Sequence, residues 1–198
     1  MTGVIIATSM EAAPLLAMAG IVGGADGDSP VIHDLGTAAG LTVCVCGMGP
    51  ERARSGLDML LDRCRANVVV NVGVAGTVGA GIEVGSVLKI TSVCLWPRVE
   101  TFYACRVDRW PDLPPAILAT VDSPVFDPVL RNDIARHADL VDMECAAVAQ
   151  GCHARGVPLY SIKGVTDQAG GNDRKRLLAN LDRVSAALAS LVWRELVQ

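Results

Sequence analysis

Aromatic side chains and long apolar runs are both scarce in this sequence. Phe, Tyr and Trp make up 4% of the 198 residues, although 51% of the chain is hydrophobic. The apolar content is therefore mostly Ala, Val and Leu, which fits buried parallel strands with small-residue helices packed closely on them. No segment approaches the roughly 20 uninterrupted apolar residues that a membrane-spanning helix needs, so we expect no membrane insertion.

The sequence also has no basic patch, and we expect no secretory leader. Lys and Arg number 17 and Asp and Glu number 21, interspersed along the chain, for a formal net charge of -4. This pattern predicts no nucleic-acid partner, because phosphate backbones are bound by clustered positive charge. The first residues have no basic region, and the apolar run at 4–7 is too short for a signal peptide. We therefore expect a cytoplasmic protein with a single domain over residues 1–198.

The seven cysteines form no CxxC pair, and their odd number argues against a disulfide framework. Cys44 and Cys46 alternate with valines, which places both on one face of a strand. We interpret the cysteines as reduced, buried, small hydrophobic residues. Cys152 and His153 lack the ligand spacing of a metal site, so the sequence predicts no metal and no other cofactor.

Residues 140–173 are interpreted as one strand–helix–strand unit that carries two acids. Its elements are expected at Leu140–Met143, Cys145–Arg155 and Leu159–Val165. Two strands joined by a helix in this way are predicted to be parallel, with a right-handed crossover. Glu144 at the start of the helix and Asp167 after the second strand would then both face the edge where open α/β sheets bind ligands.

A third acid occupies a similar position near the start of the chain. Gly3–Ala7 is an unbroken run typical of a central strand, and a short helix is predicted over Ala12–Ala19, with Pro14 in its first turn. Glu11 lies at the junction between them. Each acid also has a structural interpretation, as a helix N-terminal charge or a loop residue. Three acids at one predicted edge nevertheless indicate a binding site.

Further strands and helices alternate along the chain. The expected strands are Leu41–Cys46, Val68–Val72 and Val87–Val93, and the expected helices are Glu51–Arg65, Arg131–Ala138 and Asp173–Gln198. Residues 20–34 are predicted to be a turn-rich hairpin region. The last helix carries one apolar stripe at three-and-four spacing, so we interpret it as a packing helix without chemistry.

Glycines follow the most apolar strand, where they would let a ligand approach the backbone closely. Gly73, Gly76 and Gly79 have the spacing GxxGxxG, which meets neither the dinucleotide fingerprint GxGxxG nor the Walker phosphate loop. Arg52 and Arg54 lie in the first turn of a predicted helix after a glycine turn. They are candidates to hold an anion there, or else solvated side chains.

The secondary-structure pattern weakens between Trp96 and Pro128. This segment holds both Phe, one of the two Tyr, two of the three Trp and six of the ten Pro. It is predicted to be a mobile or specificity-giving segment. Its aromatic candidates for stacking on a flat ligand, each of which could equally pack in the core, are Phe102, Tyr103, Trp110 and Phe126.

Four short pieces occur in a recognisable order: Ser9-Met10-Glu11, Asn71–Gly76 (NVGVAG), Val141–Ala146 (VDMECA) and Val165-Thr166-Asp167. Together they resemble the nucleoside phosphorylase/nucleosidase superfamily, and within it the 5′-methylthioadenosine/S-adenosylhomocysteine nucleosidases. The resemblance implies an α/β fold with three layers, α/β/α, around a central mixed, largely parallel sheet. It also implies a homo-oligomer that acts on a small-molecule purine nucleoside without a cofactor.

The resemblance further implies roles for individual residues. Glu11 matches the acid that activates the attacking water, and Asp167 matches the acid that protonates the purine at N7. Glu144 matches the acid that binds the ribose hydroxyls, with Met143 packing on the sugar. Other substrate contacts are expected at Ala75, Gly76, Val125 and Phe126. In this chemistry burial keeps Asp167 protonated near neutral pH, whereas Glu144 is ionised at its helix N-terminus.

The expected function is hydrolysis of the N-glycosidic bond of an adenine nucleoside such as 5′-methylthioadenosine or S-adenosylhomocysteine. Asn71 stands where related phosphorylases place an Arg on phosphate, which favours water as the nucleophile. Three other interpretations stay open: a phosphate-dependent purine nucleoside phosphorylase, an adenosylhopane-type nucleosidase, and a nucleoside-binding protein without catalysis. The chain departs from the family pattern at residues 121–126 and after Asp167, where the base and the 5′ substituent would be recognised.

Overall fold

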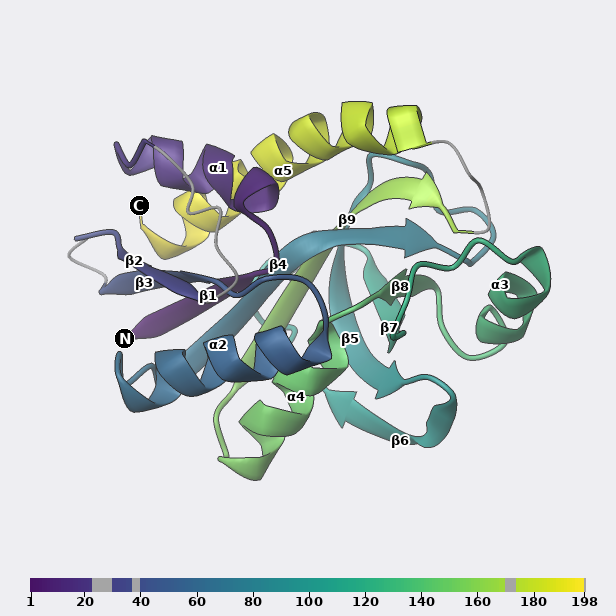
Figure 1. The fold of residues 1–198 in the computed structure, drawn as a ribbon, viewed down its shortest axis with the longest axis horizontal. Coiled ribbons are helices and arrows are strands. Elements are labelled where there is room, and N and C mark those ends of the chain that lie inside the picture. Colours follow the sequence, from purple (N-terminus) through teal and green to yellow (C-terminus); the bar gives the residue numbers. More distant parts are fainter. Residues whose placement is uncertain (23–29, 37–39, 170–173, 198) are drawn as a thin grey trace.

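The computed structural model describes residues 1–22, 30–36, 40–169 and 174–197, which form one nine-stranded sheet with helices on both sides (Figure 1). The strands are β1 (Thr2–Ile6), β2 (Val31–Asp34), β3 (Leu41–Val45), β4 (Val68–Thr77), β5 (Val87–Leu95), β6 (Arg98–Ala104), β7 (Pro115–Thr120), β8 (Leu140–Asp142) and β9 (Leu159–Gln168). The helices are α1 (Ser9–Met18), α2 (Pro50–Asp62), α3 (Pro128–Ile134), α4 (Cys145–Ala154) and α5 (Arg174–Leu196). None of the described helices has the length and apolarity to cross a membrane.

Strand β9 closes part of the sheet on itself. The hydrogen-bonded order is β2-β3-β1-β4-β8-β7-β5-β6, and β9 pairs with both β4 and β5. The strands β4, β8, β7, β5 and β9 therefore form a closed ring, from which β1, β3 and β2 extend. Within the described residues five pairings are parallel and four are antiparallel. The sheet is therefore mixed, as expected, with parallel pairings only slightly more numerous than antiparallel ones.

The predicted strand–helix–strand unit exists, but its expected parallel geometry is wrong. Strand β8 runs antiparallel to β4, whereas β9 runs parallel to β4, so β8 and β9 point in opposite directions. The long strand β4 accepts both partners because its last residues, Gly76 and Thr77, pair with β8 as well as with β9. Strand β8 therefore points back toward the middle of β4, and α4 begins there.

Several predicted boundaries also differ from the structure. The expected glycine loop after Val72 continues as strand to Thr77, because β9 and β8 supply hydrogen-bonding partners for it. The weakly patterned segment at 96–128 contains β6 and β7. Helix α1 begins three residues earlier than predicted, so Pro14 lies inside it and not in its first turn. Residues 23–29 of the predicted hairpin region lie outside the described residues, and β2 follows them.

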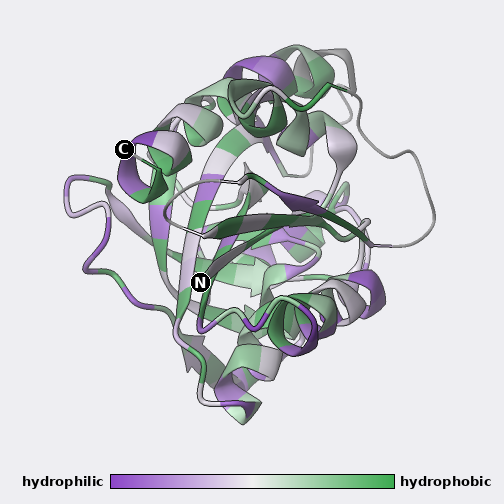
Figure 2. Ribbon diagram, turned by 90° about the vertical axis from the view of Figure 1, so that its left-hand side faces the viewer, coloured by the Kyte–Doolittle hydropathy of each residue, from purple (hydrophilic) through white to green (hydrophobic). Residues whose placement is uncertain are grey.

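Two apolar clusters hold the helices to the sheet. Helices α1 and α5 lie together on one side and α2 and α4 on the other (Figure 1), each over its own cluster of buried side chains. Figure 2 shows apolar strands between these helices, as expected for a chain whose strands are rich in Val and Ile. Helices α1 and α4 therefore reach the same strand, β4, from opposite faces.

Candidate active site

Glu11 is fixed by two elements at once. Thr8 caps α1, and Glu11 completes a capping box, in which its Oε2 accepts hydrogen bonds from the Thr8 backbone N–H (3.0 Å) and hydroxyl (2.7 Å). Its other oxygen, Oε1, accepts a 2.9 Å bond from the N–H of Val74 in β4. A purely structural role in capping α1 therefore accounts for only one carboxylate oxygen of Glu11. The other oxygen reaches β4, near the centre of the sheet.

Glu144 stands at the N-cap of α4, but its side chain makes no capping hydrogen bond. Its Oε1 instead accepts a 2.7 Å bond from the N–H of Gly49, in the turn before α2. The side chain is buried, and burial, followed by the charge of Asp142, raises the pKa of Glu144 to about 7, although Lys163 and the Gly49 N–H oppose this shift. The helix N-terminus therefore does not by itself keep Glu144 fully ionised at neutral pH, because burial opposes it.

Asp142 and Lys163 form a buried ion pair that was not predicted from the sequence. The Lys163 ammonium lies 2.8 Å from Asp142 Oδ2, with side-chain exposures of 2% and 1%. Burial alone would lower the pKa of Lys163, but the attraction and hydrogen bond of Asp142 raise it above its usual value. The signal in the sequence was a single lysine inside the apolar run at 159–165, where an unpaired charge would be costly.

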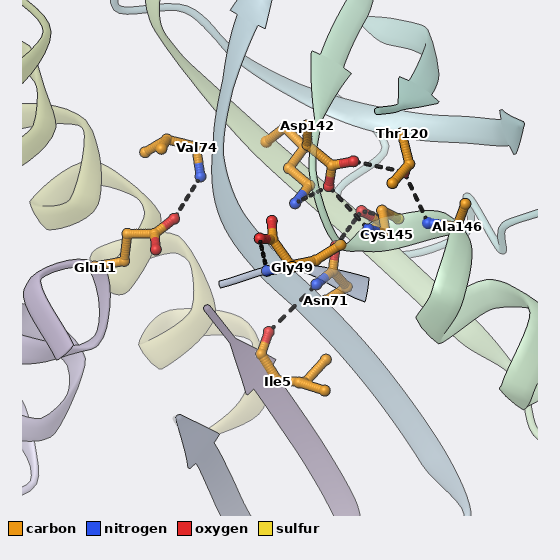
Figure 3. A network of polar contacts seen from close by, with 12 residues as sticks. Ile5, Glu11, Gly49, Asn71, Val74, Thr120, Asp142, Cys145 and Ala146 are labelled. Carbon is orange, nitrogen blue, oxygen red and sulfur yellow. Dashed lines mark hydrogen bonds and ion pairs between the residues drawn. The ribbon is translucent and has the colours of Figure 1, made fainter. Parts of the chain in front are cut away.

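The carboxylate of Glu11 and the ammonium of Lys163 converge above Gly73. A Cβ on Gly73 would lie 3.0 Å from Glu11 Oε1 and 3.3 Å from Lys163 Nζ. Figure 3 shows Glu11 on one side of β4 and Asp142 on the other. Glu11 and Glu144 are also close enough for the charge of Glu11 to raise the pKa of Glu144. The structure thus brings two of the three predicted acids together around the middle of β4.

Asp167 lies on β9, level with Gly76 of β4. Its Oδ1 accepts a 2.8 Å bond from the Thr166 hydroxyl, and burial raises its pKa. Lys163 is four residues earlier on the same strand, or roughly 13 Å away at the usual rise of an extended chain. Asp167 is therefore at the same end of the ring as Glu11 and Glu144, but it stands apart from them, and neither is among the groups that shift its pKa.

The remaining predicted substrate-binding residues differ in exposure. Ala75 and Val125 are buried, and Gly76 has Asp167 Oδ2 at 3.4 Å from the position of a Cβ. Met143 is half-buried against the apolar cluster that includes Val125. Phe126 is 60% exposed.

Two of the aromatic stacking candidates serve packing. Trp110 is buried, contacts Tyr160 edge-on and donates from its indole N–H to the Leu191 carbonyl (3.4 Å). Because Tyr160 lies at the start of β9, Trp110 is remote from Asp167 at the other end of that strand. Tyr103 packs edge-on against His153 of α4. Phe102 is exposed on β6.

The two candidate anion-binding arginines have other neighbours. The Nε atom of Arg54 lies 3.4 Å from Oδ1 of Asp58, in the next turn of α2. Arg52 packs over Gly47, with its Nη1 at 3.2 Å from the position of a Cβ there. A cavity of about 250 Å³ lies elsewhere, between the ends of β6 and α4 and the start of β9, and is lined by Arg106, His153 and Leu159 among others. This cavity does not contain any of the three acids.

Comparisons with known proteins agree with this fold. The model of the Phosphorylase superfamily matches residues 99–196. A 5′-methylthioadenosine/S-adenosylhomocysteine nucleosidase from an Exiguobacterium species is 28% identical over 152 residues, which is 62% of this chain and 65% of that protein. The match therefore spans slightly less than two thirds of the length of this relative.

Solved structures resemble the chain over nearly all of its length. A 5′-methylthioadenosine/S-adenosylhomocysteine nucleosidase from Helicobacter pylori, solved with butyl-thio-DADMe-Immucillin-A, has a TM-score of 0.85 at 17% identity and covers 98% of this chain and 96% of its own. A futalosine hydrolase mutant from the same species has a TM-score of 0.84 at 17% identity, with 96% of both chains covered. At these identities the likeness shows the fold alone.

Proposed function

Since the chain belongs to the phosphorylase superfamily, we propose that it is a nucleosidase that hydrolyses the N-glycosidic bond of an adenine nucleoside. The observation that carries the proposal is the pair of carboxylates, Glu11 and Glu144, fixed by main-chain N–H groups at the middle of β4. The nucleosidases to which the chain is similar suggest 5′-methylthioadenosine and S-adenosylhomocysteine as substrates. The proposal includes one catalytic domain over residues 1–198, a cytoplasmic location and a homo-oligomeric assembly.

The proposed reaction divides the work among three acids. The oxygen of a water molecule attacks the anomeric carbon while Glu11 accepts its proton. The bond from that carbon to the purine breaks, and its electron pair leaves with the base. Asp167, whose pKa is raised by burial, donates a proton to the purine at N7. The base therefore departs neutral, which lowers the barrier to its release.

Glu144 binds the ribose in this scheme. Its Oε1 is held by Gly49, and its carboxylate would accept hydrogen bonds from the ribose hydroxyls and stabilise the positive charge that develops on the ring. This role requires the ionised form. A substrate that brings hydroxyl donors and a developing positive charge would favour that form, although Glu144 of the free protein has a pKa of about 7. Met143, Ala75, Gly76, Val125 and Phe126 are the proposed further contacts.

Two features support water over phosphate as the nucleophile. The side chains of Glu11, Asp142 and Glu144 surround a single ammonium, Lys163, and this excess of negative charge would repel a phosphate dianion. Asn71, at the position where phosphorylases use an Arg, is buried. Its amide nitrogen donates to the Ile5 carbonyl (3.5 Å), and its oxygen accepts from the Ser161 hydroxyl (3.3 Å).

The test is an assay of base release over a panel of adenine nucleosides, with and without inorganic phosphate. The panel carries different 5′ substituents: 5′-methylthioadenosine, S-adenosylhomocysteine, and an apolar 5′ group of the adenosylhopane type. We expect free adenine and free sugar at equal rates in both buffers. Phosphate-dependent turnover with ribose 1-phosphate as product would identify a phosphorylase instead. Tight binding across the panel with no product would identify a binding protein.

A further inference from the structure

Lys163 stands out among the charged side chains of the described residues, because it is the one lysine or arginine in the buried core. It projects from β9 on the face that carries α4, next to Gly73 of the neighbouring strand. A buried ion pair adds little net stability, because both partners lose their hydration, and an apolar pair of similar size often serves as well. The position of Lys163 among three carboxyl groups therefore points to a role in the site.

Both carboxylate oxygens of Asp142 accept hydrogen bonds. Its Oδ1 accepts a 2.6 Å bond from the Thr120 hydroxyl, and its Oδ2 accepts from the Cys145 N–H (3.0 Å) as well as from Lys163 (2.8 Å). Thr120 in turn accepts a 2.8 Å bond from the N–H of Ala146. These bonds fix the turn between β8 and α4, as Figure 3 shows. Because Glu144 lies within that turn, Asp142 also determines the direction in which the Glu144 side chain leaves the backbone.

The charges that face Glu144 come from several elements. Asp142 and Lys163 act on it from β8 and β9, and Glu11 acts from α1. The thiol of Cys46, the residue after β3, is also within range. The thiols of Cys105 and Cys145 also lie near the ammonium of Lys163. Burial raises the pKa of both thiols, which keeps them neutral. Among the groups of the described residues that shift the pKa of Glu144, Lys163 is a cation, and Asp142 and Glu11 are anions.

We propose that Lys163 and Asp142 are positioning residues: a buried ion pair, 2.8 Å apart and anchored in the turn that bears Glu144, which supplies the charges that face the acid proposed to bind the sugar. Lys163 favours the carboxylate of Glu144, and Asp142 disfavours it while holding Lys163 in place. Neither residue needs to touch the substrate. This inference rests on the proposed nucleosidase function, because it assigns the pair to the acid that binds the ribose.

The direct test is a carboxyl NMR titration of Glu144, with Glu144→Gln used to assign the signal. Removal of the ammonium in Lys163→Met is expected to raise the pKa of Glu144 by about one unit or more, since an opposite charge within a few ångströms shifts a carboxyl by that amount. Asp142→Asn is expected to lower it. Lys163→Arg keeps the charge and is expected to return the pKa toward the wild-type value.

Two design features keep the test decisive. Lys163→Met and Asp142→Asn each leave a buried charge without its partner and can impair folding, so the fold of each variant is checked first; Asp142→Asn retains one acceptor, Oδ1, for the Thr120 hydroxyl, and Lys163→Arg keeps the ion pair. Lys89→Met is the matched control, because Lys89 binds the backbone carbonyls of Trp110 and Pro111 away from the acids. An unchanged Glu144 titration in both Lys163→Met and Asp142→Asn would overturn the inference.

The kinetic readout separates this inference from the proposed function. In an active enzyme the acid limb of kcat/KM should move to higher pH in Lys163→Met and to lower pH in Asp142→Asn, with each unit of displacement worth about tenfold below the limb. A purely structural role would reduce activity at every pH without moving the limb. If the wild type releases no base from any nucleoside, the proposed function fails, and the NMR titration still reports on the pair.

Discussion

The backbone N–H of Gly49 donates a 2.7 Å hydrogen bond to Oε1 of Glu144, although 95 positions separate the two residues. Gly49 has a φ of 96°, a left-handed conformation that favours glycine. A Cβ there would meet no atom within 4 Å, so backbone conformation and not space requires the glycine. The turn before α2 is therefore shaped to aim one N–H at the acid that begins α4.

Glu144→Gln is predicted to change how stability depends on pH. The pKa of Glu144 rises from 4.5 to about 7 on folding, so between these values the folded protein binds a proton that the unfolded chain has released. Stability therefore falls as pH rises through this window and levels off above it. Gln carries no such proton. We expect the free energy of unfolding of Glu144→Gln, relative to that of the wild type, to increase by on the order of 3 kcal/mol across this pH window.

This gain is measured by urea unfolding of both proteins at either end of the window. Glu195→Gln, which removes an exposed carboxyl from α5, is the matched control and should follow the wild type at both pH values. Parallel pH dependence of the wild type and Glu144→Gln would show that Glu144 titrates alike in the folded and unfolded protein.

Substitutions of Glu11 should separate catalysis from helix capping. Gln can replace Glu in a capping box, so Glu11→Gln should keep the stability of α1 while losing about 10²- to 10⁴-fold in kcat, the usual contribution of a general base. Glu11→Ala should lose the same activity and also about 1 kcal/mol of stability, because the Thr8 N–H then has no partner. Steady-state kinetics and thermal unfolding measure the two effects. Full activity in Glu11→Gln would remove it from the proposed mechanism.

Asp167→Asn should remove the basic limb of the pH–rate profile. The protonated carboxyl is the proposed proton donor, so wild-type activity should fall as pH rises through the raised pKa of Asp167. Asn cannot transfer a proton, and kcat should drop by about 10²- to 10⁴-fold with no such limb left. Asp122→Asn, an exposed change in the loop after β7, is the control. A basic limb that persists in Asp167→Asn would assign it to another group.

Gly73→Ala should block the space between Glu11 and Lys163. The added methyl group would lie 3.0 Å from Glu11 Oε1 and 3.3 Å from Lys163 Nζ. Both groups would have to shift, so we expect kcat to fall at least about tenfold, with about 1–3 kcal/mol of lost stability from overpacking. Val74→Ala is the control, because it keeps the backbone N–H that holds Glu11. Equal activity in the two variants would show that the space above Gly73 is not used.

Local sequence signals were reliable where the structure depends on near neighbours. The start of α4 after Glu144 and the long final helix were predicted, because caps and three-and-four spacing act within a few residues. A helix next to Glu11 was also predicted, but it begins at Ser9, so Glu11 lies in its first turn and not before it. The direction of β8 was predicted wrongly. A strand of three residues carries little information of its own, and its partner is chosen by the closed ring around β4.

Reading along the chain was enough to find three acids after strands, a family pattern in four pieces, and strands apolar enough to be buried. Three contacts depend on the folded chain: Gly49 binds Glu144, Lys163 pairs with Asp142, and Trp110 packs in the core at the far end of β9. The partners in these contacts are far apart in sequence. Hydrogen bonds and charges act over a few ångströms in space, and closure of the strands into a ring brings residues within that range regardless of their separation in sequence.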